Sequence, residues 1–454
     1  MNRTVHLPGE ATHRPPRFLK NTCDNYVAMT QSEWTGEPAQ PRFSRRILLL
    51  TQTFPPDPAA VGQHMRDLAG RLASRGNDVT VVTADRGYDD PSVTFLRDEL
   101  TPEGVHVQRL RYTSFGKSSL LHRIAAMLSF GIQSGLLTLL HPQLDAVVFT
   151  TSPPFIGLWA VAVGALRRVP TVFWAMDLNP AQLVALGKLP PRGTAARVLQ
   201  WINRVILRST SVTIALDELM AQRLQQEARR PIAVVVIPPW SPDESLIPTP
   251  HESNPFRMKY ALDDKTVVMY SGNHTPSNPL TTLLDAIVAL HDCPRLQFVF
   301  VGEGTGKREV ERYVEKYALK NVLVLPYQPK ATLSDSLSAA DVHVVSLGDE
   351  MAGIIHPCKV YGAMAVGRPI LCFGPSPSHM TRILATWNNG WAIRHGDVNE
   401  AVATLRHIAT LSQPELATIG MRGLVAIDGH FDPIALSSSV AAVVENAVSR
   451  QRRE

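Results

Sequence analysis

The sequence contains little cysteine. Its 454 residues include four cysteines, Cys23, Cys293, Cys358 and Cys372, and none of them forms a C-x-x-C pair. This scatter excludes a disulfide scaffold and offers no zinc-ligand spacing, and it favours free thiols in a reducing compartment. We therefore expect a cytoplasmic protein without a structural metal site.

Charged residues and long apolar runs are also scarce. Charged residues make up 19% of the chain, and the net charge of +5 is too small to indicate nucleic acid, for which no motif is present. The longest apolar run, residues 120–140, contains His122, Arg123 and Gln133, which argues against a transmembrane span. Residues 1–44 are polar and lack the apolar stretch of a secretory signal, so they are predicted to be a disordered tail.

The chain does contain two successive runs of apolar, β-branched segments separated by helical patterns. Such alternation predicts parallel sheets covered by helices on both faces, and a restart of the series predicts two Rossmann-like domains of an α/β protein. Pro238, Pro239 and Pro242 mark the expected hinge, which gives domains at residues 45–240 and 241–432 and a last helix at 433–454. The predicted strands are residues 46–51, 79–83, 105–110, 146–151, 171–176, 212–216 and 233–237 in the first domain, and 266–271, 298–302, 322–325, 342–346 and 370–373 in the second.

The most informative segment is residues 353–374, which reads as a loop, a short helix and a buried strand. Pro357 suits the first turn of the helix, Gly367 suits its C-terminal cap, and Lys359 lies at the helix entrance. Unpaired backbone N–H groups and an ammonium at this end make a site suited to a diphosphate. The alternative is a surface lysine on an ordinary helix packed against a sheet.

Two segments raise the question of a membrane surface. Residues 194–208 form an amphipathic pattern carrying Arg197, Arg204 and Arg208, and residues 120–140 are strongly apolar. Basic amphipathic helices can lie on anionic lipid. Taken singly, each segment fits an ordinary domain helix with solvated arginines better than a lipid-binding helix, and a membrane-embedded acceptor would reverse that preference.

Five motifs together resemble glycosyltransferase family 4, in particular the enzymes of bacterial exopolysaccharide, capsule and colanic acid biosynthesis. They are LLLTQTFPPDPAAVGQH at 48–64, TSPPF at 151–155, WAMDLNP at 174–180, YSGNH at 270–274 and PCKVYGAMAVGRP at 357–369. The similarity runs from about residue 45 to the C-terminus. It implies the GT-B architecture, with two Rossmann-like domains facing each other across a cleft, the second binding a nucleotide sugar and the last helix crossing back to the first.

The resemblance also assigns residues. Lys359 is expected to stabilise the charge that develops on the leaving diphosphate, Asp177 to orient or deprotonate the acceptor hydroxyl, and Glu350, or its neighbour Asp349, to contact the donor sugar. For Asp177 a turn or N-cap role before Asn179 is an equally good interpretation. The expected nucleotide-sugar contacts are Gly62, Gly272, Asn273, His274, Gly302, Tyr327, Gly353, His356 and Tyr361.

The chain departs from the family pattern at two points. Residues 273–278 lack the arginine and lysine with which many relatives grip the diphosphate, so more charge compensation is left to Lys359. Gly362 stands where many relatives have a glutamate that holds the ribose hydroxyls. Ribose binding therefore needs other groups here.

The function implied is that of a metal-independent, retaining glycosyltransferase of hexosyltransferase type that needs no cofactor. Its donor would be a UDP- or GDP-sugar, and its acceptor a lipid-linked saccharide at the inner face of a membrane, where the enzyme would bind peripherally. Two alternatives stay open: a nucleotide-sugar epimerase of the same fold, which needs no acceptor, and a noncatalytic relative that binds a nucleotide sugar. Transfer to an added acceptor separates the first reading from both.

Overall fold

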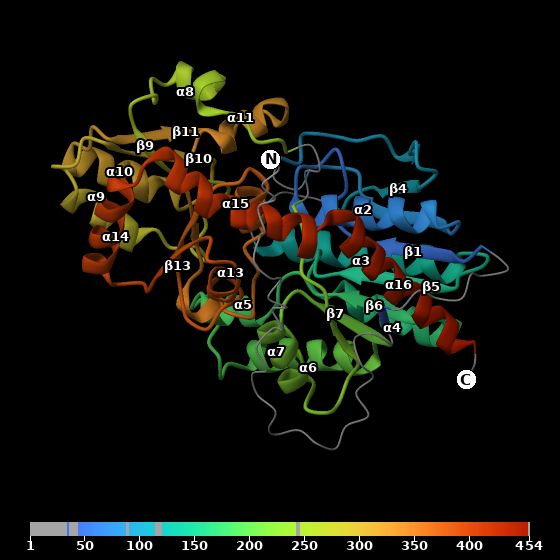
Figure 1. Ribbon diagram of the computed structural model, residues 1–454. Coiled ribbons are helices and arrows are strands. Elements are labelled where there is room, and N and C mark those ends of the chain that lie inside the picture. The colour runs from blue at the N-terminus through green and yellow to red at the C-terminus, as the bar shows by residue number, and fades with distance from the viewer. Residues whose placement is uncertain (1–33, 36–43, 88–89, 114–119, 242–245, 453–454) are drawn as a thin grey trace, which may run out of the picture.

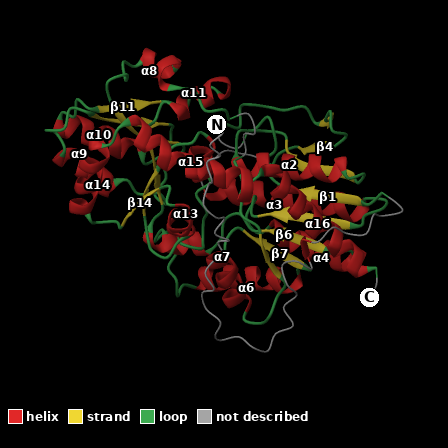
Figure 2. Ribbon diagram, viewed as in Figure 1, coloured by secondary structure: helices red, strands yellow, loops and turns green. Residues whose placement is uncertain are grey.

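The structure is a computed structural model that describes residues 34–35, 44–87, 90–113, 120–241 and 246–452. The predicted tail at residues 1–44 lies outside the described residues except for Trp34, Thr35 and Ser44. Figure 1 shows two α/β domains side by side, and Figure 2 shows that each has a sheet covered by helices.

The first domain is built on an eight-stranded sheet with the order β3-β4-β2-β1-β5-β6-β7-β8. All neighbouring strands are parallel except β3 and β4, which are antiparallel. Its central strands are almost entirely buried, as near-continuous apolar strands covered on both faces must be. The strands are β1 (Arg46–Leu50), β2 (Asp78–Ala84), β3 (Asp98–Leu100), β4 (His106–Leu110), β5 (Ala146–Thr150), β6 (Thr171–Trp174), β7 (Val212–Ala215) and β8 (Val234–Val236).

The second domain has a six-stranded parallel sheet with the order β11-β10-β9-β12-β13-β14. The strand order reverses next to β9, which is where ligands bind in open parallel sheets. The strands are β9 (Thr266–Ser271), β10 (Leu296–Val301), β11 (Val322–Leu325), β12 (Val342–Ser346), β13 (Ile370–Phe373) and β14 (Gly390–Ile393).

Each predicted strand is present to within two residues at either end, whereas β3 and β14 were not predicted. Both are poor apolar runs: β3 is exposed along its whole length, and β14 begins at a glycine and is buried only at Ile393. Pairing with a neighbouring strand, rather than apolar periodicity, therefore determines these two edge strands.

Helices cover both faces of the first sheet. The crossovers from β4 to β5, β5 to β6 and β6 to β7 run in the same direction across the sheet, so right-handed connections place their helices in one layer. That layer contains α3 (Leu120–Leu140), α4 (Ile156–Arg167), α6 (Thr194–Ser209) and, next to α6, α7 (Glu218–Ala228). The opposite face carries α2 (Ala60–Ser74) and the C-terminal helix α16 (Pro433–Gln451), which contacts α2, β5, β6 and β7.

The remaining elements belong to or lead into the second domain, apart from a short helix after β6. They are α5 (Ala181–Ala185) after β6, then α8 (Pro255–Lys259), α9 (Thr281–Ala289), α10 (Lys307–Tyr317), α11 (Leu333–Ser338), α12 (Lys359–Ala365), α13 (His379–Trp387), α14 (Val398–Thr410) and α15 (Gln413–His430), with the 3₁₀ turns η1 (His251–Ser253), η2 (Lys330–Thr332) and η3 (Asp349–Met351). None of the helices in the described ranges combines the length and apolarity needed to cross a bilayer.

Buried tryptophans attach to the first domain two chain segments that the sequence predicted to be a disordered tail and a hinge. Trp34, inside the segment predicted to be disordered, is 5% exposed and lies under the Arg450 guanidinium of α16, 4.1 Å from the ring centroid. Trp240, in the predicted hinge, is fully buried against Trp174 and donates from Nε1 to Asp67 at 2.9 Å. Indole burial anchors both segments, because a large apolar ring gains by leaving water, and at Trp240 the indole N–H is also satisfied.

Glu445 connects α16 to the first domain. Its carboxylate is 3% exposed and accepts hydrogen bonds from Arg75, at 2.9 to 3.2 Å, and from Asn77 at 2.8 Å, while Arg45 lies 3.7 Å away. A buried carboxylate needs such partners, and its partners in turn need the carboxylate.

We expect Glu445→Ala to lower the free energy of unfolding by about 3–5 kcal/mol, because the substitution leaves the half-buried Arg75 and buried Arg45 guanidiniums without their counter-charge. Urea denaturation measures this change in the free energy of unfolding. The matched control Glu311→Ala removes an exposed carboxylate on α10 and should change the value by no more than about 0.5 kcal/mol. Equal effects of the two variants would contradict the anchoring role.

Four buried histidines make the fold sensitive to acid. Burial lowers the pKa of His64, His274 and His343 to about 4, and that of His379 well below its usual value. The unfolded chain therefore takes up protons below pH 6.5 that the folded chain does not take up until about pH 4. Each histidine thus contributes stability that is complete above pH 6.5 and declines as the pH falls.

The free energy of unfolding should fall between pH 6.5 and 4 by about 1.4 kcal/mol per pH unit for each such histidine. Denaturant titrations at several pH values test this. His64 packs edge-on against Trp240, with ring centroids 4.9 Å apart, so His64→Phe keeps an aromatic ring and should remove one histidine's share of the slope. An unchanged slope in that variant would show that His64 is not one of the contributors.

Candidate active site

The carboxyl ends of the parallel strands in the two domains face each other. Three contacts join their loops: Leu178 donates from its backbone N–H to the Ile354 carbonyl at 2.9 Å, Arg223 to the Ala352 carbonyl at 2.8 Å, and Asp217 pairs with His356 at 3.0 Å. A Cβ on Gly353, whose φ is +68°, would lie 2.8 Å from the Leu219 backbone. Glycine at 353 therefore permits the closest approach of the domains.

Lys359 lies at the start of α12 and points across the end of β9. Its Nζ is 4.0 Å from the centroid of the Tyr270 ring, donates to the Tyr270 hydroxyl, and donates to the Asn273 carbonyl at 3.0 Å. Burial lowers the pKa of Lys359 to about 7 and raises that of the Tyr270 phenol well above its usual value. Among the described residues, the hydrogen bonds of Lys359 go only to uncharged oxygen atoms.

Glycines form the floor beneath this ammonium. Gly272, Gly302 and Gly304 have φ between +125° and +129°, in the region that favours glycine. A Cβ on Gly272 would lie 2.5 Å from Lys359 Cε, and one on Gly302 would lie 2.2 Å from the Gly272 carbonyl oxygen. Any side chain at these positions would displace the lysine or separate the two loops.

The predicted donor residues Gly272, Asn273, His274, Gly302, Tyr327 and Lys359 are thus neighbours. Gly304 packs on Asn273 and His274, and the Tyr327 ring lies beside Gly302. Tyr327 is 53% exposed, so about half of its side chain is accessible to solvent. We use the name Lys359 cradle for the group that consists of Tyr270, Gly272, Asn273, Gly302, Gly304, Tyr327 and Lys359.

His274 is positioned differently from the phosphate donor that the sequence suggested. Its ring is buried at 1% exposure, 4.7 Å from the Tyr270 ring centroid, and its pKa is lowered to about 4 by burial and by Lys359. The ring is therefore neutral at pH 7 and lies beneath the cradle, while its backbone N–H donates to the Glu303 carbonyl at 2.7 Å.

A second group, absent from the sequence predictions except for His356 and Tyr361, lies at the domain contact. His356 Nδ1 is 3.0 Å from an Asp217 carboxylate oxygen, its Nε2 is 2.8 Å from the Tyr361 hydroxyl, and its ring stacks on His379 with centroids 3.6 Å apart. Tyr361 is 1% exposed, so its hydroxyl is occupied by His356 inside the protein. Asp217 caps α7 through the Met220 N–H at 2.8 Å, and its pKa is lowered to about 2, since these partners outweigh its burial.

Asp217, His356 and His379 are the one set of three metal-ligand types that lie close together in the described chain, with ligand atoms within 4.8 Å. Their geometry is poor for an ion. The two imidazole rings lie in planes only 23° apart, so their in-plane lone pairs do not converge on one point. The arrangement suits hydrogen bonding better, and Asp217 holds His356 at the junction of the domains.

Asp177 follows β6 on the first-domain side. The structure does not use it as a helix cap, because Pro180 occupies the N-cap of α5 without a side-chain bond. Burial raises the pKa of Asp177 to about 6. The pKa of the Cys358 thiol, next to Lys359, is raised to about 12, first by burial and second by the nearby Asp177 carboxylate. Asp177 therefore lies near the start of α12, across the domain contact.

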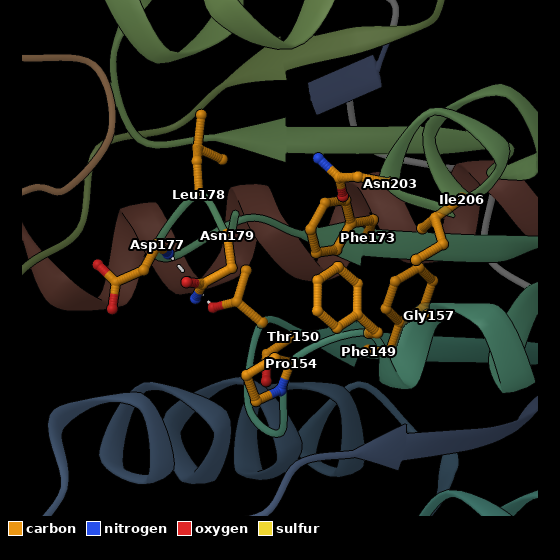
Figure 3. A pocket seen from close by; sticks show the side chains of 12 residues that line it. Phe149, Thr150, Pro154, Gly157, Phe173, Asp177, Leu178, Asn179, Asn203 and Ile206 are labelled. Carbon is orange, nitrogen blue, oxygen red and sulfur yellow. Dashed lines mark hydrogen bonds between the residues drawn. The ribbon is translucent and has the colours of Figure 1, made fainter. Parts of the chain in front are cut away.

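Asp177 also borders a small pocket between α4 and α6. Figure 3 shows its carboxylate pointing away from the apolar end, where the rings of Phe149 and Phe173 stack with centroids 4.9 Å apart. Asn179, Asn203 and Ile206 form other walls. The pocket thus has an apolar end between the helices and a carboxylate at its outer end.

The other predicted residues are dispersed. Gly62 lies in the first turn of α2, where a Cβ would be 2.9 Å from the Thr53 backbone, so it brings α2 close to the loop after β1. Glu350 and Asp349 lie in η3 with exposed side chains, in the loop that also contains Gly353. Asp217 and His379 were not predicted as site residues. The position of Asp217 soon after the buried strand β7 is the sequence feature that could have indicated it.

Family comparisons agree with this arrangement. Residues 59–240 match a glycosyl transferase 4-like domain, and residues 253–419 match glycosyl transferases group 1. A probable glycosyltransferase, WbjE of Pseudomonas aeruginosa, is 23% identical over 83% of this chain and 91% of its own length. The putative colanic acid biosynthesis glycosyl transferase WcaI of Escherichia coli K12 is 23% identical over 71% of this chain and 81% of its own.

Solved structures share the fold. Sucrose-phosphate synthase of Thermosynechococcus elongatus has a TM-score of 0.67 at 17% identity, covering 87% of this chain and 96% of its own. HepE of Anabaena, in complex with UDP and glucose, has a TM-score of 0.64 at 17% identity, covering 87% and 98%. The chain therefore belongs to glycosyltransferase family 4 and is an enzyme of the GT-B fold, with a 4-like domain followed by a group 1 domain.

Proposed function

We propose that this enzyme moves a sugar, with retention of configuration, from a UDP- or GDP-sugar to the hydroxyl of a lipid-linked saccharide in cell-surface polysaccharide biosynthesis. The observation that carries the donor half is the Lys359 cradle. It presents an ammonium that no carboxylate of the described chain pairs with, over a floor of glycines at the strand ends of the second sheet. Polyanions bind such a site because glycine lets them approach the backbone and the cation.

The choice of a nucleotide sugar has support from outside the chain. HepE, which shares the fold, was solved with UDP and with UDP-glucose. In this chain the exposed Tyr327 ring beside Gly302 offers a surface for a base or sugar, and the cradle accommodates the diphosphate. The retaining outcome and the independence from metal follow the family resemblance.

The chemistry requires stabilisation of the leaving group. When the bond between the anomeric carbon and the β-phosphate oxygen breaks, negative charge develops on that phosphate, and a cation already in place lowers the energy of the transition state more than that of the ground state. Lys359 fills this role. Asp177, whose pKa is about 6, is mostly ionised at neutral pH and can orient the acceptor hydroxyl or take its proton.

The acceptor half rests on the relatives and on the first domain. WcaI is named for colanic acid biosynthesis, and polysaccharide units of this kind are built on lipid carriers. The small pocket beside Asp177 lies between helices of the first domain, with stacked phenylalanine rings at one end and the carboxylate at the other, and it marks where we expect the acceptor hydroxyl to approach. We therefore place the enzyme at the inner face of a membrane as a peripheral protein.

Transfer is tested by incubating the enzyme with a panel of UDP- and GDP-sugars and membrane lipid extract, and measuring nucleoside diphosphate release and product mass. We expect release with one base only, dependent on acceptor. Lys359→Ala should reduce turnover by about 10²–10³-fold because the developing phosphate charge loses its cation. Lys320→Ala, an exposed lysine elsewhere in the domain, should leave turnover unchanged.

Wild-type turnover in Lys359→Ala would refute the role of Lys359. Interconversion of free nucleotide sugars without an acceptor would contradict the transferase hypothesis and support an epimerase instead.

Diphosphate binding should also take up a proton. Free Lys359 has a pKa of about 7, and a bound diphosphate raises it, so at pH 8 a mostly neutral amine becomes protonated when UDP or GDP binds. Affinity should therefore fall as the pH rises above 7, by up to about tenfold per pH unit. Calorimetry at pH 8 in two buffers of different ionisation heat counts the protons.

We expect close to one proton per nucleotide in the wild type and none in Lys359→Arg, whose guanidinium stays charged. Equal proton uptake by both proteins would assign the titrating group elsewhere.

A further inference from the structure

Helix α3 carries a stripe of large apolar side chains on its exposed side. Leu121, Ile124, Leu128, Ile132, Leu136 and Leu139 recur at intervals of three and four residues, and each is between 38% and 78% exposed. At 100° per residue these positions form a single straight stripe along the helix. A helix of a globular domain normally turns such a stripe inward.

The buried side of α3 carries Ala126 and Phe130, and its C-terminal half is small and polar. Ser134 and Thr138 are buried, and their hydroxyls bond to carbonyls of their own helix, those of Gly131 and Ser134. Gly131 and Gly135 accept the Trp159 ring of α4, since a Cβ on Gly131 would lie 2.3 Å from its Nε1. The glycines allow α4 to pack closely, and they fix the apolar stripe toward the outside.

The neighbouring helices continue this surface. On α4, Leu166 is 72% exposed, and on α6, Val198 and Trp201 are 55% and 58% exposed. Because α3 contacts α4, α4 contacts α6, and all three cover the same face of the first sheet, their outer sides form one surface. We call it the α3–α4–α6 face. Contiguous apolar surface of this extent marks an interaction site.

The charge of this part of the chain identifies the partner. Residues 117–208 contain nine lysines and arginines, two aspartates and no glutamate, in a protein whose net charge is only +5. Lys188, Arg168, Arg192 and Arg197 are exposed among these cations. A second copy of this chain would bring the same excess of positive charge against itself, whereas an anionic lipid surface complements it.

We propose that the α3–α4–α6 face docks on an anionic bilayer, with α3 lying in the interfacial plane and its leucine stripe among the lipid headgroups and upper acyl chains. Trp159 and Trp201 suit the polar–apolar boundary. The inference deepens the proposed function, because it specifies how the enzyme reaches a lipid-linked acceptor. The pocket beside Asp177 is lined by Gly157 of α4 and by Asn203 and Ile206 of α6, so it lies against two of the helices that dock.

The test measures co-sedimentation of the full chain with vesicles of phosphatidylcholine alone and with about 30 mol% phosphatidylglycerol. We expect strong binding only to the anionic vesicles, weakened by salt. The double variant Leu128→Gln and Leu136→Gln should bind at least about tenfold more weakly, as should Arg168→Gln combined with Arg197→Gln.

Matched controls change the same residue types on other surfaces. Met258→Gln with Ile434→Gln removes exposed apolar side chains on α8 and α16, and Arg308→Gln removes an exposed cation on α10; both should bind as the wild type does. All substituted residues are exposed, and thermal unfolding confirms that the variants fold.

Vesicle binding that is the same in stripe variants and wild type would overturn the proposal. So would a dimer in the absence of lipid that the stripe variants convert to a monomer, which would assign the face to self-association. Because sedimentation needs no sugar donor, a failure of docking is separable from a failure of the transferase function, which Lys359→Ala tests on its own.

Discussion

The site depends on keeping the Lys359 ammonium, which has no carboxylate partner among the described residues, between two loops of the second domain. Lys359 is held by neutral oxygens and the Tyr270 ring, and burial brings its pKa down to about 7. The positive φ angles of Gly272, Gly302 and Gly304 let the loops close under it. A carboxylate in this place would satisfy the lysine in the free enzyme and weaken its hold on a phosphate. In the proposed function the diphosphate binds a cation that only uncharged groups of the described chain hold, and the surrounding fold maintains that arrangement.

The two domains are coupled where this site meets the first sheet. Asp217 closes the N-terminus of α7 and holds His356, which in turn contacts Tyr361 of α12, the helix that carries Lys359. Glu445 fastens the last helix to the first domain from the opposite face of the sheet. A change in the relative position of the domains therefore acts on α12 directly through the Asp217–His356 pair. The buried hydrophobic cluster that runs from the first sheet through the interdomain loops to α16 supports the same coupling.

The helices on the two faces of the first sheet differ in what they contact. One face carries α2 and α16, which complete the core, and the other carries the α3–α4–α6 face, where apolar side chains stay outside. Strand-end loops join both layers to the cleft. In the proposed function the second domain binds the donor and the first domain receives the acceptor, a division that the GT-B fold allows.

Apolar periodicity determined most of the fold, because buried parallel strands such as β9 and β12 must be continuously apolar whatever surrounds them. The family resemblance, not periodicity, selected most residues of the Lys359 cradle, and the structure brings them together because loops after parallel strands meet at one edge of a sheet. The exposed β3 and the glycine-initiated β14 lacked that signal, because strand pairing decides them. Only the tertiary structure showed that His274 lies beneath the cradle and that Asp217, His356 and His379 meet, since their contacts join residues far apart in the chain. The sequence likewise showed that residues 120–140 are apolar, but which side of α3 faces outward depends on how Trp159 packs against Gly131 and Gly135.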